Sequence, residues 1–274
     1  MPLEKTTWRL LVDPPALGAW NMAVDESLLE YVGRGESLPT LRLYAWEPAC
    51  LSLGYAQPFA DVDTVRLHER GWDAVRRPTG GRAILHTDEL TYSITAPPDE
   101  PRVLGTVLES YNRLAGALVA AVRSLGIPVE MKDHIPGQSG AQGPVCFEVP
   151  SAYEITVGGK KLIGSAQARR REGVLQHGTL PLYGDLGRIT EALAFLDEAV
   201  RADAAVKLWS RATTFETVLG RKIEWNTAAQ AFVHAFESEL NITFERAEMS
   251  AKENTRAKTL MQEKYANASW TERT

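Results

Sequence analysis

The sequence predicts an α+β fold, in which a mainly antiparallel but mixed sheet is flanked by helices and the C-terminal third is helical. Three observations lead to this prediction. Short segments of alternating apolar and polar residues, separated by Pro or Gly turns, recur between residues 8 and 95, as is typical of strands. Residues 153–182 continue as strands around Gly158-Gly159, a strong hairpin signal. Beyond residue 186, apolar residues recur at helical spacing.

The length and net charge of the chain limit the number of domains and the kinds of partner. At about 150 residues per domain, the 274 residues correspond to one large domain, which we place at residues 1–245, with a helical extension over 246–274. The 30 Lys and Arg against 35 Asp and Glu give a net charge of −5, which argues against a nucleic-acid partner. The longest apolar run, Leu114–Val122, is too short to cross a bilayer, and residues 1–8 do not resemble a signal peptide. We expect a cytoplasmic monomer with no membrane partner.

The N-terminal half is predicted to alternate strands with helices. Strands are expected where apolar and polar residues alternate, and helices where apolar residues recur every three to four positions. The predicted strands are 8–12, 40–44, 50–54, 73–77, 83–86 and 90–95. The predicted helices are 21–32, 60–70 and 104–125, the last of which has the strongest pattern and ends before Gly126.

The second half begins with a loop, residues 132–145, that is rich in glycine and proline. Strands at 153–157, 160–169 and 174–182 then form an antiparallel meander. Three capping motifs predict helix starts, and residues 242–245 predict a last strand. The motifs are Thr213–Glu216, Thr227–Gln230 and Ser250–Glu253, and the final helix is expected to end near Tyr265.

Two cysteines, Cys50 and Cys146, are too few for a disulfide scaffold, and no histidine spacing predicts a metal or other cofactor. Cys50 lies within an alternating apolar strand, which indicates a core residue. Cys146 follows the glycine-rich loop, a position at which catalytic residues are often found. Its position alone leaves an inert buried thiol as the alternative.

Two further segments combine glycine with polar side chains. In Arg76–His86 the paired Gly80 and Gly81 allow a backbone to approach a ligand, although a tight turn with solvated arginines fits the same pattern. Gln176–Gly178 interrupts an apolar strand, which indicates close approach of a ligand or another backbone, or a core histidine beside a bulge. Lys161 and Arg169–Arg171 are by themselves typical of solvated hairpin residues, although the arginines would also suit an acidic partner.

Four segments in this order resemble the lipoate–protein ligase and octanoyltransferase family: Asn21–Glu26, Arg76–His86, Gly159–Gln167 and Gln176–Gly178. The resemblance implies the biotin/lipoate ligase fold, with residues 1–245 as its catalytic domain. It also implies an acyl site between the glycine-rich loop and the lysine-bearing strand. One side of that site would be lined by Arg77, Gly80, Gly81 and His86, and the other by Gly164, Ser165, Ala166, His177 and Gly178.

The residues Cys146–Glu154 resemble a group of octanoyltransferases common in Gram-positive bacteria. In that group the cysteine carries the acyl thioester, and a lysine fifteen positions later, here Lys161, tunes its reactivity. ATP-dependent ligases of the family need no cysteine and usually have a third glycine where this chain has Arg82. The single-domain octanoyltransferases place their cysteine after the strand that matches 174–182, where this chain has none.

The resemblance therefore implies octanoyl transfer through a Cys146 thioester, without a cofactor. The donor would be octanoyl-acyl carrier protein, and the acceptor a lipoyl-domain lysine such as that of the glycine cleavage H protein. The alternatives are an octanoyl amidotransferase acting between lipoyl domains and an ATP-dependent lipoate–protein ligase. A catalytically silent acyl-binding protein is a further alternative, although such a protein needs neither Cys146 nor Lys161.

Overall fold

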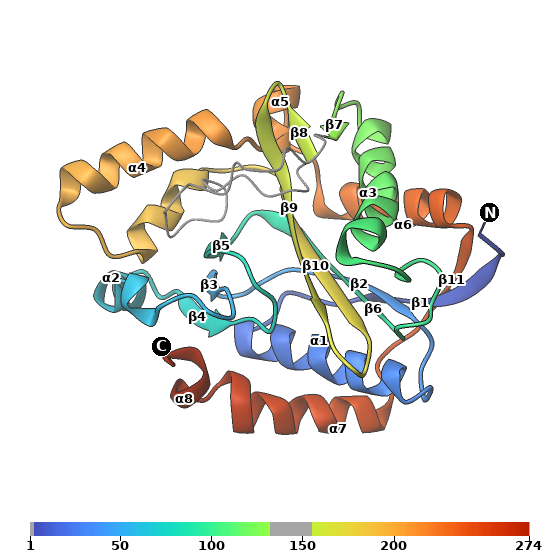
Figure 1. Ribbon diagram of the computed structural model, residues 1–274. Helices are drawn as coiled ribbons and strands as arrows, with labels where there is room; N and C mark the ends of the chain where they lie inside the picture. Colours follow the sequence, from blue (N-terminus) through green and yellow to red (C-terminus); the bar gives the residue numbers. More distant parts are fainter. Residues whose placement is uncertain (1–2, 132–154, 274) are drawn as a thin grey trace.

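The computed structural model describes residues 3–131 and 155–273, and within them eight strands form one mixed sheet (Figure 1). The strand order is β11-β1-β2-β6-β10-β9-β8-β7. β1 runs parallel to both β11 and β2, and all other neighbours are antiparallel. The bounds are β1 Thr6–Val12, β2 Thr40–Tyr44, β6 Glu89–Ala96, β7 Glu130–Met131, β8 Ile155–Val157, β9 Lys160–Arg169, β10 Val174–Pro181 and β11 Ile242–Arg246.

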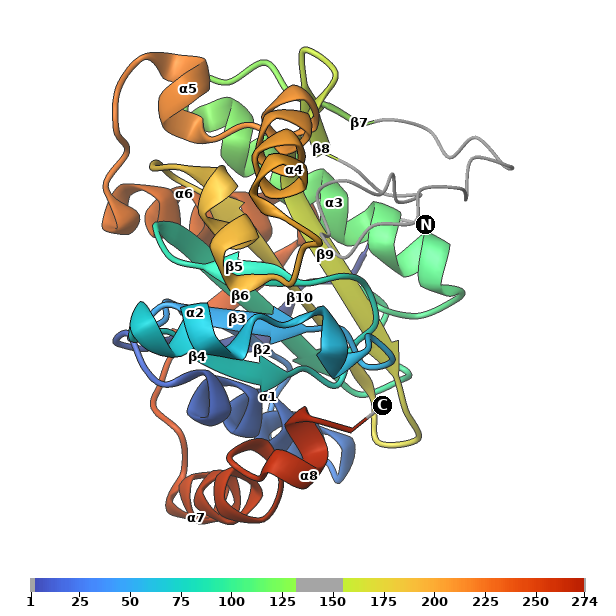
Figure 2. The same cartoon turned by 90° about the vertical axis from the view of Figure 1, so that its left-hand side faces the viewer.

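A smaller sheet of three strands lies beside the large one (Figure 2). Its central strand β3 (Cys50–Leu53) is parallel to β4 (Asp73–Arg76) and antiparallel to β5 (Ile84–His86). The chain reaches β4 through a 3₁₀ turn, Phe59–Asp61, and the short helix α2, Thr64–Glu69. The single helix predicted over residues 60–70 is therefore divided, because Asp63 caps α2 by accepting a hydrogen bond from the Arg66 backbone.

Helices cover both faces of the large sheet (Figure 1). α3 (Val107–Ser124) and α6 (Trp225–Leu240) pack on the face to which β2 and β6 turn Leu41, Leu43, Leu90, Tyr92 and Ile94. The opposite face is covered by α1 (Gly18–Gly33), against which α7 (Ala251–Leu260) packs. α4 (Glu198–Arg211) and α5 (Phe215–Leu219) complete the α+β fold that the sequence predicts.

Strand alternation makes the α1 side of the sheet unusually polar. Because successive side chains of a strand point to opposite faces, β2 and β6 turn Arg42, Glu89, Thr91 and Ser93 away from the apolar core. All of these side chains are nevertheless buried, so each needs a polar partner within the protein. The functional site is built on this buried polar face.

Several predicted boundaries are wrong by a few residues, each for a local reason. The strongest predicted helix begins at Val107, because Thr106 and Glu109 form a capping box, while Leu104 lies outside and is 52% exposed. Thr227 does not start α6, which begins two residues earlier after Glu224. α5 is capped by Thr214 rather than Thr213, because the Thr213 backbone is bonded to β9.

Other local predictions are confirmed. The meander β8–β9–β10 turns at Gly158-Gly159, where both glycines have positive φ. The last predicted strand is β11, and the capping box of Ser250 and Glu253 starts α7. One π-helical turn, Met261–Tyr265, and the short helix α8 (Ala268–Thr271) end the chain.

The C-terminal segment is bonded to the core of the domain at two buried arginines. Arg9 of β1 donates to both carboxylate oxygens of Glu253, at 3.1 and 2.7 Å. Arg76 of β4 donates to the backbone carbonyls of Thr271 and Arg273, each at 2.8 Å. Within the residues described, no helix is long and apolar enough to span a membrane.

The Arg9–Glu253 pair yields a stability prediction with an internal control. Arg9→Met leaves a carboxylate that is 1% exposed without its cation, so we expect a loss of about 3–5 kcal/mol in the free energy of unfolding. Arg34→Met removes the cation of the pair Arg34–Glu30, whose arginine is 53% exposed, and the expected loss is below about 1 kcal/mol. Urea denaturation measures both, and equal losses would contradict the prediction.

Candidate active site

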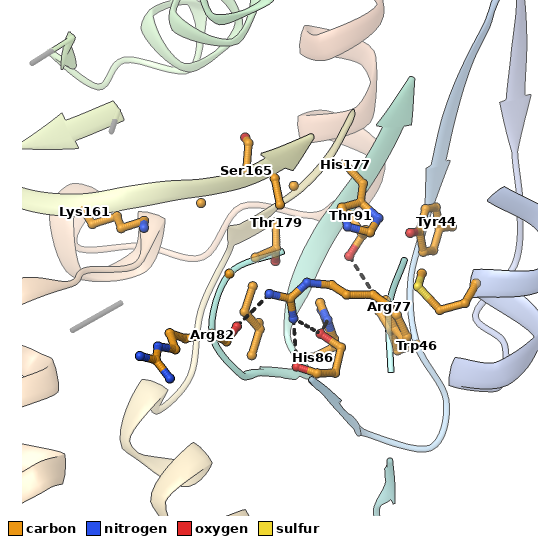
Figure 3. Close-up of a pocket in the computed structure, with 17 residues that line it drawn as sticks. Tyr44, Trp46, Arg77, Arg82, His86, Thr91, Lys161, Ser165, His177 and Thr179 are labelled. Carbon is orange, nitrogen blue, oxygen red and sulfur yellow. Dashed lines mark hydrogen bonds between the residues drawn. The ribbon is translucent and has the colours of Figure 1, made fainter. Parts of the chain in front are cut away.

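A cavity of about 300 Å³ lies where the two sheets meet (Figure 3). Its walls come from α1, from the ends of β2 and β3, from the loop before β5, and from β6, β9 and β10. The lining residues are Met22, Tyr44, Trp46, Ser52, Arg77, Gly81, Arg82, Ile84, His86, Thr91, Lys161, Gly164, Ser165, Ala166, His177, Gly178 and Thr179.

Most of the site residues predicted from the sequence meet in this cavity. Nine of them line it, namely Arg77, Gly81, His86, Lys161, Gly164, Ser165, Ala166, His177 and Gly178. Gly80 does not line the cavity, and a Cβ atom added to it would meet no atom within 4 Å. Cys146 lies outside the described residues.

The glycine-rich loop, residues 78–82, is held in place by Arg77. Its guanidinium donates to the carbonyls of Gly80 and Arg82, at 2.9 and 2.7 Å, and to the carbonyl and hydroxyl of Ser52 on β3. Gly81 adopts a φ of +96°, which disfavours any residue with a Cβ atom. The Arg77 side chain thus fixes the shape of the loop with its own hydrogen bonds.

His86 is oriented by partners on both ring nitrogens. Nδ1 lies 2.5 Å from Oε1 of the buried Glu89, and Nε2 lies 2.7 Å from the Ser52 hydroxyl. Burial alone would raise the pKa of Glu89, but the contacts with His86 and with neighbouring threonine hydroxyls outweigh it and lower that pKa. In a neutral imidazole, Nδ1 then carries the proton toward the carboxylate, and Nε2 accepts from Ser52. The indole of Trp46 stacks on the ring, with centroids 3.9 Å apart.

His177 forms a second arrangement of the same kind. Its Nε2 lies 2.6 Å from the hydroxyl of Thr79 in the glycine-rich loop, and its Nδ1 lies 3.6 Å from Asp25 of α1. Burial lowers the pKa of His177, against the opposing influence of Asp25, so the ring is neutral near pH 7. His177 therefore connects the loop on one side of the cavity to the helix on the other.

Asp25 is fully buried and joins α1 to three strands of the large sheet. Its carboxylate accepts from Arg42 at 2.9 Å, from Tyr44 at 3.0 Å and from Ser93 at 2.7 Å. Burial would raise the pKa of Asp25, but the contact with His177 and the charge of Arg42 together lower it. The carboxylate is therefore ionised and accepts hydrogen bonds from every partner.

Gly178 allows three elements to approach one another behind the cavity. A Cβ atom at this position would lie 2.6 Å from the Gly164 carbonyl, 2.6 Å from the Ser165 hydroxyl and 2.7 Å from the Tyr92 ring. Tyr92 and Ser165 are hydrogen-bonded at 2.7 Å, and burial raises the pKa of Tyr92 to about 12, so the phenol keeps its proton. The close approach noted in the sequence is thus between backbone strands and an aromatic ring.

Lys161 lies at the start of β9 and is 3% exposed. Its backbone carbonyl accepts from the Thr213 amide, which fixes this end of the strand. The neighbouring Lys160 donates instead to the Trp209 carbonyl at 2.6 Å, on the opposite side of the strand. In Figure 3, Lys161 and Arg82 lie toward one end of the cavity and Tyr44 toward the other.

Sequence reasoning missed Arg82 and the aliphatic, aromatic and hydroxyl part of the wall, which comprises Met22, Tyr44, Trp46, Ser52, Ile84, Thr91 and Thr179. Met22 is an apolar residue of a largely buried helix, and Tyr44 is a buried aromatic residue at the end of a strand, so no local signal separates them from the core. Asp25 did carry a signal, because a carboxylate within an apolar helix needs a buried partner. Among residues 3–131 and 155–273, no cluster of three or more His, Cys, Asp or Glu side chains is arranged to hold a metal ion.

The site can hold an elongated, mostly apolar acyl group. The end near Met22, Tyr44 and Trp46 offers apolar and aromatic surface, while Lys161 and Arg82 place positive charge toward the other end (Figure 3). The buried carboxylates of Glu89 and Asp25 are paired with histidine and hydroxyl groups of the protein. They therefore do not present an unpaired negative charge to a ligand. The arrangement suits an acyl tail whose polar head lies near Lys161.

Comparisons with known proteins agree on the family. A family model described as lipoyl protein ligase A/B catalytic domain matches residues 18–237. A protein of Moorella thermoacetica named octanoyltransferase LipM is 42% identical, with 100% of both chains covered. A protein of the same name from Exiguobacterium sibiricum is 38% identical, covering 96% of this chain and 97% of its own.

Two solved structures of similar fold are a lipoate-protein ligase A bound with ATP and a bi-partite lipoate protein ligase from Thermoplasma acidophilum. Both have a TM-score of 0.78. The first is 22% identical and covers 97% of this chain and 99% of its own. The second is 24% identical and covers 97% and 96%. At these identities the likeness shows the fold, which is the biotin/lipoate ligase-like fold expected from the sequence.

The crowding at Gly178 predicts a steric effect on stability. Gly178→Ala forces the backbone carbonyl of Gly164 or the Tyr92 ring to move, and overpacking of this kind costs about 1–3 kcal/mol. Gly116→Ala is the matched control, because Gly116 lies within α3 with nothing near its added Cβ. That replacement is expected to stabilise by up to about 1 kcal/mol. Chemical denaturation of both variants gives the two values, and a stabilised Gly178→Ala would refute the crowding.

The lowered pKa of His177 predicts a pH dependence of stability. In the unfolded chain the ring has its ordinary pKa of 6.5, so it binds a proton at a higher pH than in the folded protein. The free energy of unfolding therefore falls as the pH is lowered through 6.5. His177→Gln should flatten this decline, whereas replacing the 81% exposed His234 in the same way should leave the decline unchanged. An unflattened profile for His177→Gln, measured by urea denaturation from pH 5 to 8, would contradict the assignment.

Proposed function

This chain belongs to the lipoyl protein ligase A/B catalytic domain family, and from this premise we propose that it is an octanoyltransferase acting through a thioester on Cys146. The donor is octanoyl-acyl carrier protein. The acceptor is a lysine of a lipoyl-domain protein, and we propose the glycine cleavage H protein. The full-length relatives named octanoyltransferase LipM support the activity, and the cavity lined by Lys161 is the observation that carries its assignment to this site.

The cavity supports an acyl substrate energetically. Burying most of the seven carbons beyond the carbonyl of an octanoyl group contributes about 5 kcal/mol, at about 0.8 kcal/mol for each carbon. Tyr44, Trp46 and Met22 provide the apolar surface for the distal carbons. The hydrogen bonds that hold Arg77 and the two histidines keep this surface in place before a substrate binds, so binding does not have to order it.

The burial of Cys50 supports Cys146 as the nucleophile, because the chain has only these two cysteines. Cys50 lies in the middle strand of the small sheet, is 0% exposed and does not line the cavity. Burial, together with the negative charges of Asp73 and Glu89, raises the pKa of the Cys50 thiol well above its ordinary value. A thiol in that environment is unreactive, since the thiolate is the nucleophile.

The proposed reaction has two half-reactions. The Cys146 thiolate attacks the donor thioester carbonyl, the carrier thiolate leaves, and octanoyl-Cys146 forms. The amine of the acceptor lysine then attacks this thioester, forms the amide and releases the Cys146 thiolate. We assign the Lys161 ammonium to stabilise the Cys146 thiolate by its charge and to give its proton to the leaving carrier thiolate. The neutral Lys161 amine then accepts the proton of the incoming lysine amine, which restores the ammonium beside the released Cys146 thiolate. Its position in the cavity wall supports this role.

Cys146→Ala provides the direct test of the proposal. Purified protein is mixed with octanoyl-acyl carrier protein without ATP and with chelator, and its intact mass is measured. We expect wild type and Cys50→Ala to gain one octanoyl group, and Cys146→Ala to gain none. Adding the H protein should discharge the thioester and move the mass increase to the acceptor.

Three results would count against the proposal. Octanoyl found on Cys50 would show that the nucleophile is Cys50, in the small sheet, and not Cys146. Strict dependence on ATP and magnesium would favour a lipoate–protein ligase. Acylation by an octanoylated lipoyl domain, with no reaction from the carrier protein, would favour an amidotransferase.

A further inference from the structure

A second depression, the basic groove, adjoins the cavity and has a volume of about 830 Å³. It lies between the glycine-rich loop, the outer end of β9 and the C-terminal turn of the chain. Its lining includes Arg169 and Arg170 from the β9–β10 hairpin, and Lys264 and Trp270 from the C-terminal segment. Gly81 and Arg82 line both the groove and the cavity, so the groove begins at the cavity rim.

The groove is lined by four cations, Arg82, Arg169, Arg170 and Lys264, and none of its described lining residues is a carboxylate. Glu26 pairs with Lys264 at 2.6 Å and with Arg170 at 3.3 Å, which offsets one of these charges. Within the part of the chain that the structure describes, Arg169 donates hydrogen bonds to neutral acceptors on Gln167, Val103 and Ser110, which do not offset its charge.

The positive charges in this groove repel one another. Burial lowers the pKa of Lys264, and the charges of Arg170 and Arg273 lower it further, although Glu26 acts in the opposite direction. The Arg273 guanidinium lies 3.7 Å from the centre of the Trp270 ring, on the wall of the same groove. An anion bound here would relieve this repulsion.

The shared rim indicates which part of a substrate occupies the groove. When an acyl tail fills the cavity with its thioester near Lys161 and Arg82, the group that carries the thioester has to pass the rim at Gly81. We propose that the basic groove binds the phosphodiester-bearing pantetheine arm of the acyl carrier protein donor. This inference rests on the proposed function and adds a binding site for the donor. An acceptor lysine is itself a cation, and the same charges disfavour it in this groove.

The three adjacent arginines of the hairpin have different surroundings, and this sharpens the proposal. Arg169 and Arg170 line the groove and Arg171 does not. Arg171 lines a neighbouring depression with Glu26, Glu30, Arg34 and Glu172, and Arg170 lies between the two and lines both. The docking role expected for an Arg169–Arg171 cluster is therefore assigned to two of its members, together with Arg82 and Lys264 from other parts of the chain.

The test uses two small donors that differ only in the phosphate, octanoyl-4′-phosphopantetheine and octanoyl-pantetheine. The rate of Cys146 acylation is followed by intact mass with each donor at equal concentration, well below saturation. In wild type we expect the phosphorylated donor to react about tenfold faster, the effect of one charge-assisted hydrogen bond. In the double variant Arg82→Gln, Arg170→Gln this ratio should fall below about threefold. The ratio is insensitive to a general loss of active protein.

Arg221→Gln is the matched control, because Arg221 is exposed on the turn between α5 and α6 and lines neither depression. It should keep the wild-type ratio. Equal rates for the two donors in wild type, or an unchanged ratio in the double variant, would overturn the groove assignment alone. No acylation from either donor or from the intact carrier protein would overturn the proposed function as well. ATP-dependent acylation by free octanoate that is lost in the double variant would assign the groove to a nucleotide instead.

Discussion

The buried carboxylate of Asp25 is the constraint on which the rest of the site depends. The face of the large sheet beneath α1 carries Arg42, Tyr44, Ser93 and His177, and all four converge on this one group. A polar face can be buried only when its groups satisfy one another, so helix α1 can cover the sheet in only one rotation and register. That register also places Met22 in the cavity wall. The position of α1 thus both pairs the buried carboxylate with its partners and shapes the cavity wall.

The apolar cavity and the basic groove are distinct regions that adjoin at the glycine-rich loop. The two histidines of the cavity are held in hydrogen-bond sets within the protein, so this part of the wall offers a ligand fixed surface. The basic groove keeps several cations only partly compensated. The glycine-rich loop divides the two regions and contributes to both. A substrate with an apolar tail and an anionic tether matches this division, whereas a wholly apolar ligand would leave the groove unused.

The local elements were predictable from the sequence because alternation, turn glycines and capping boxes act within a few residues. The meander around Gly158-Gly159 and the start of α7 are examples. Features that depend on contacts between distant parts of the chain could not be predicted in this way. The sequence does not distinguish Gly80 from Gly81. In the structure, Gly81 has a φ of +96° and lines the cavity, and Gly80 does not line it. The sequence motif at Thr227 fits a capping box, but Thr227 lies within α6, which begins after Glu224. Trp46 reads as a core residue, and its stacking on His86 depends on a fold that joins two sheets.

The parallel pairing of β1 with β11 has a consequence for how the chain is made. The register joins Thr6 to Ile242, so β1 acquires one of its two neighbours only after the chain has been synthesised as far as β11. The same holds for Arg9, whose buried carboxylate partner Glu253 is synthesised later still. Until then a nascent chain exposes an unpaired strand edge and an unsatisfied cation, which is a state prone to non-native association. Completion of the fold is thus tied to the synthesis of residues 242–253, and a product truncated before them lacks both the neighbour of β1 and the partner of Arg9.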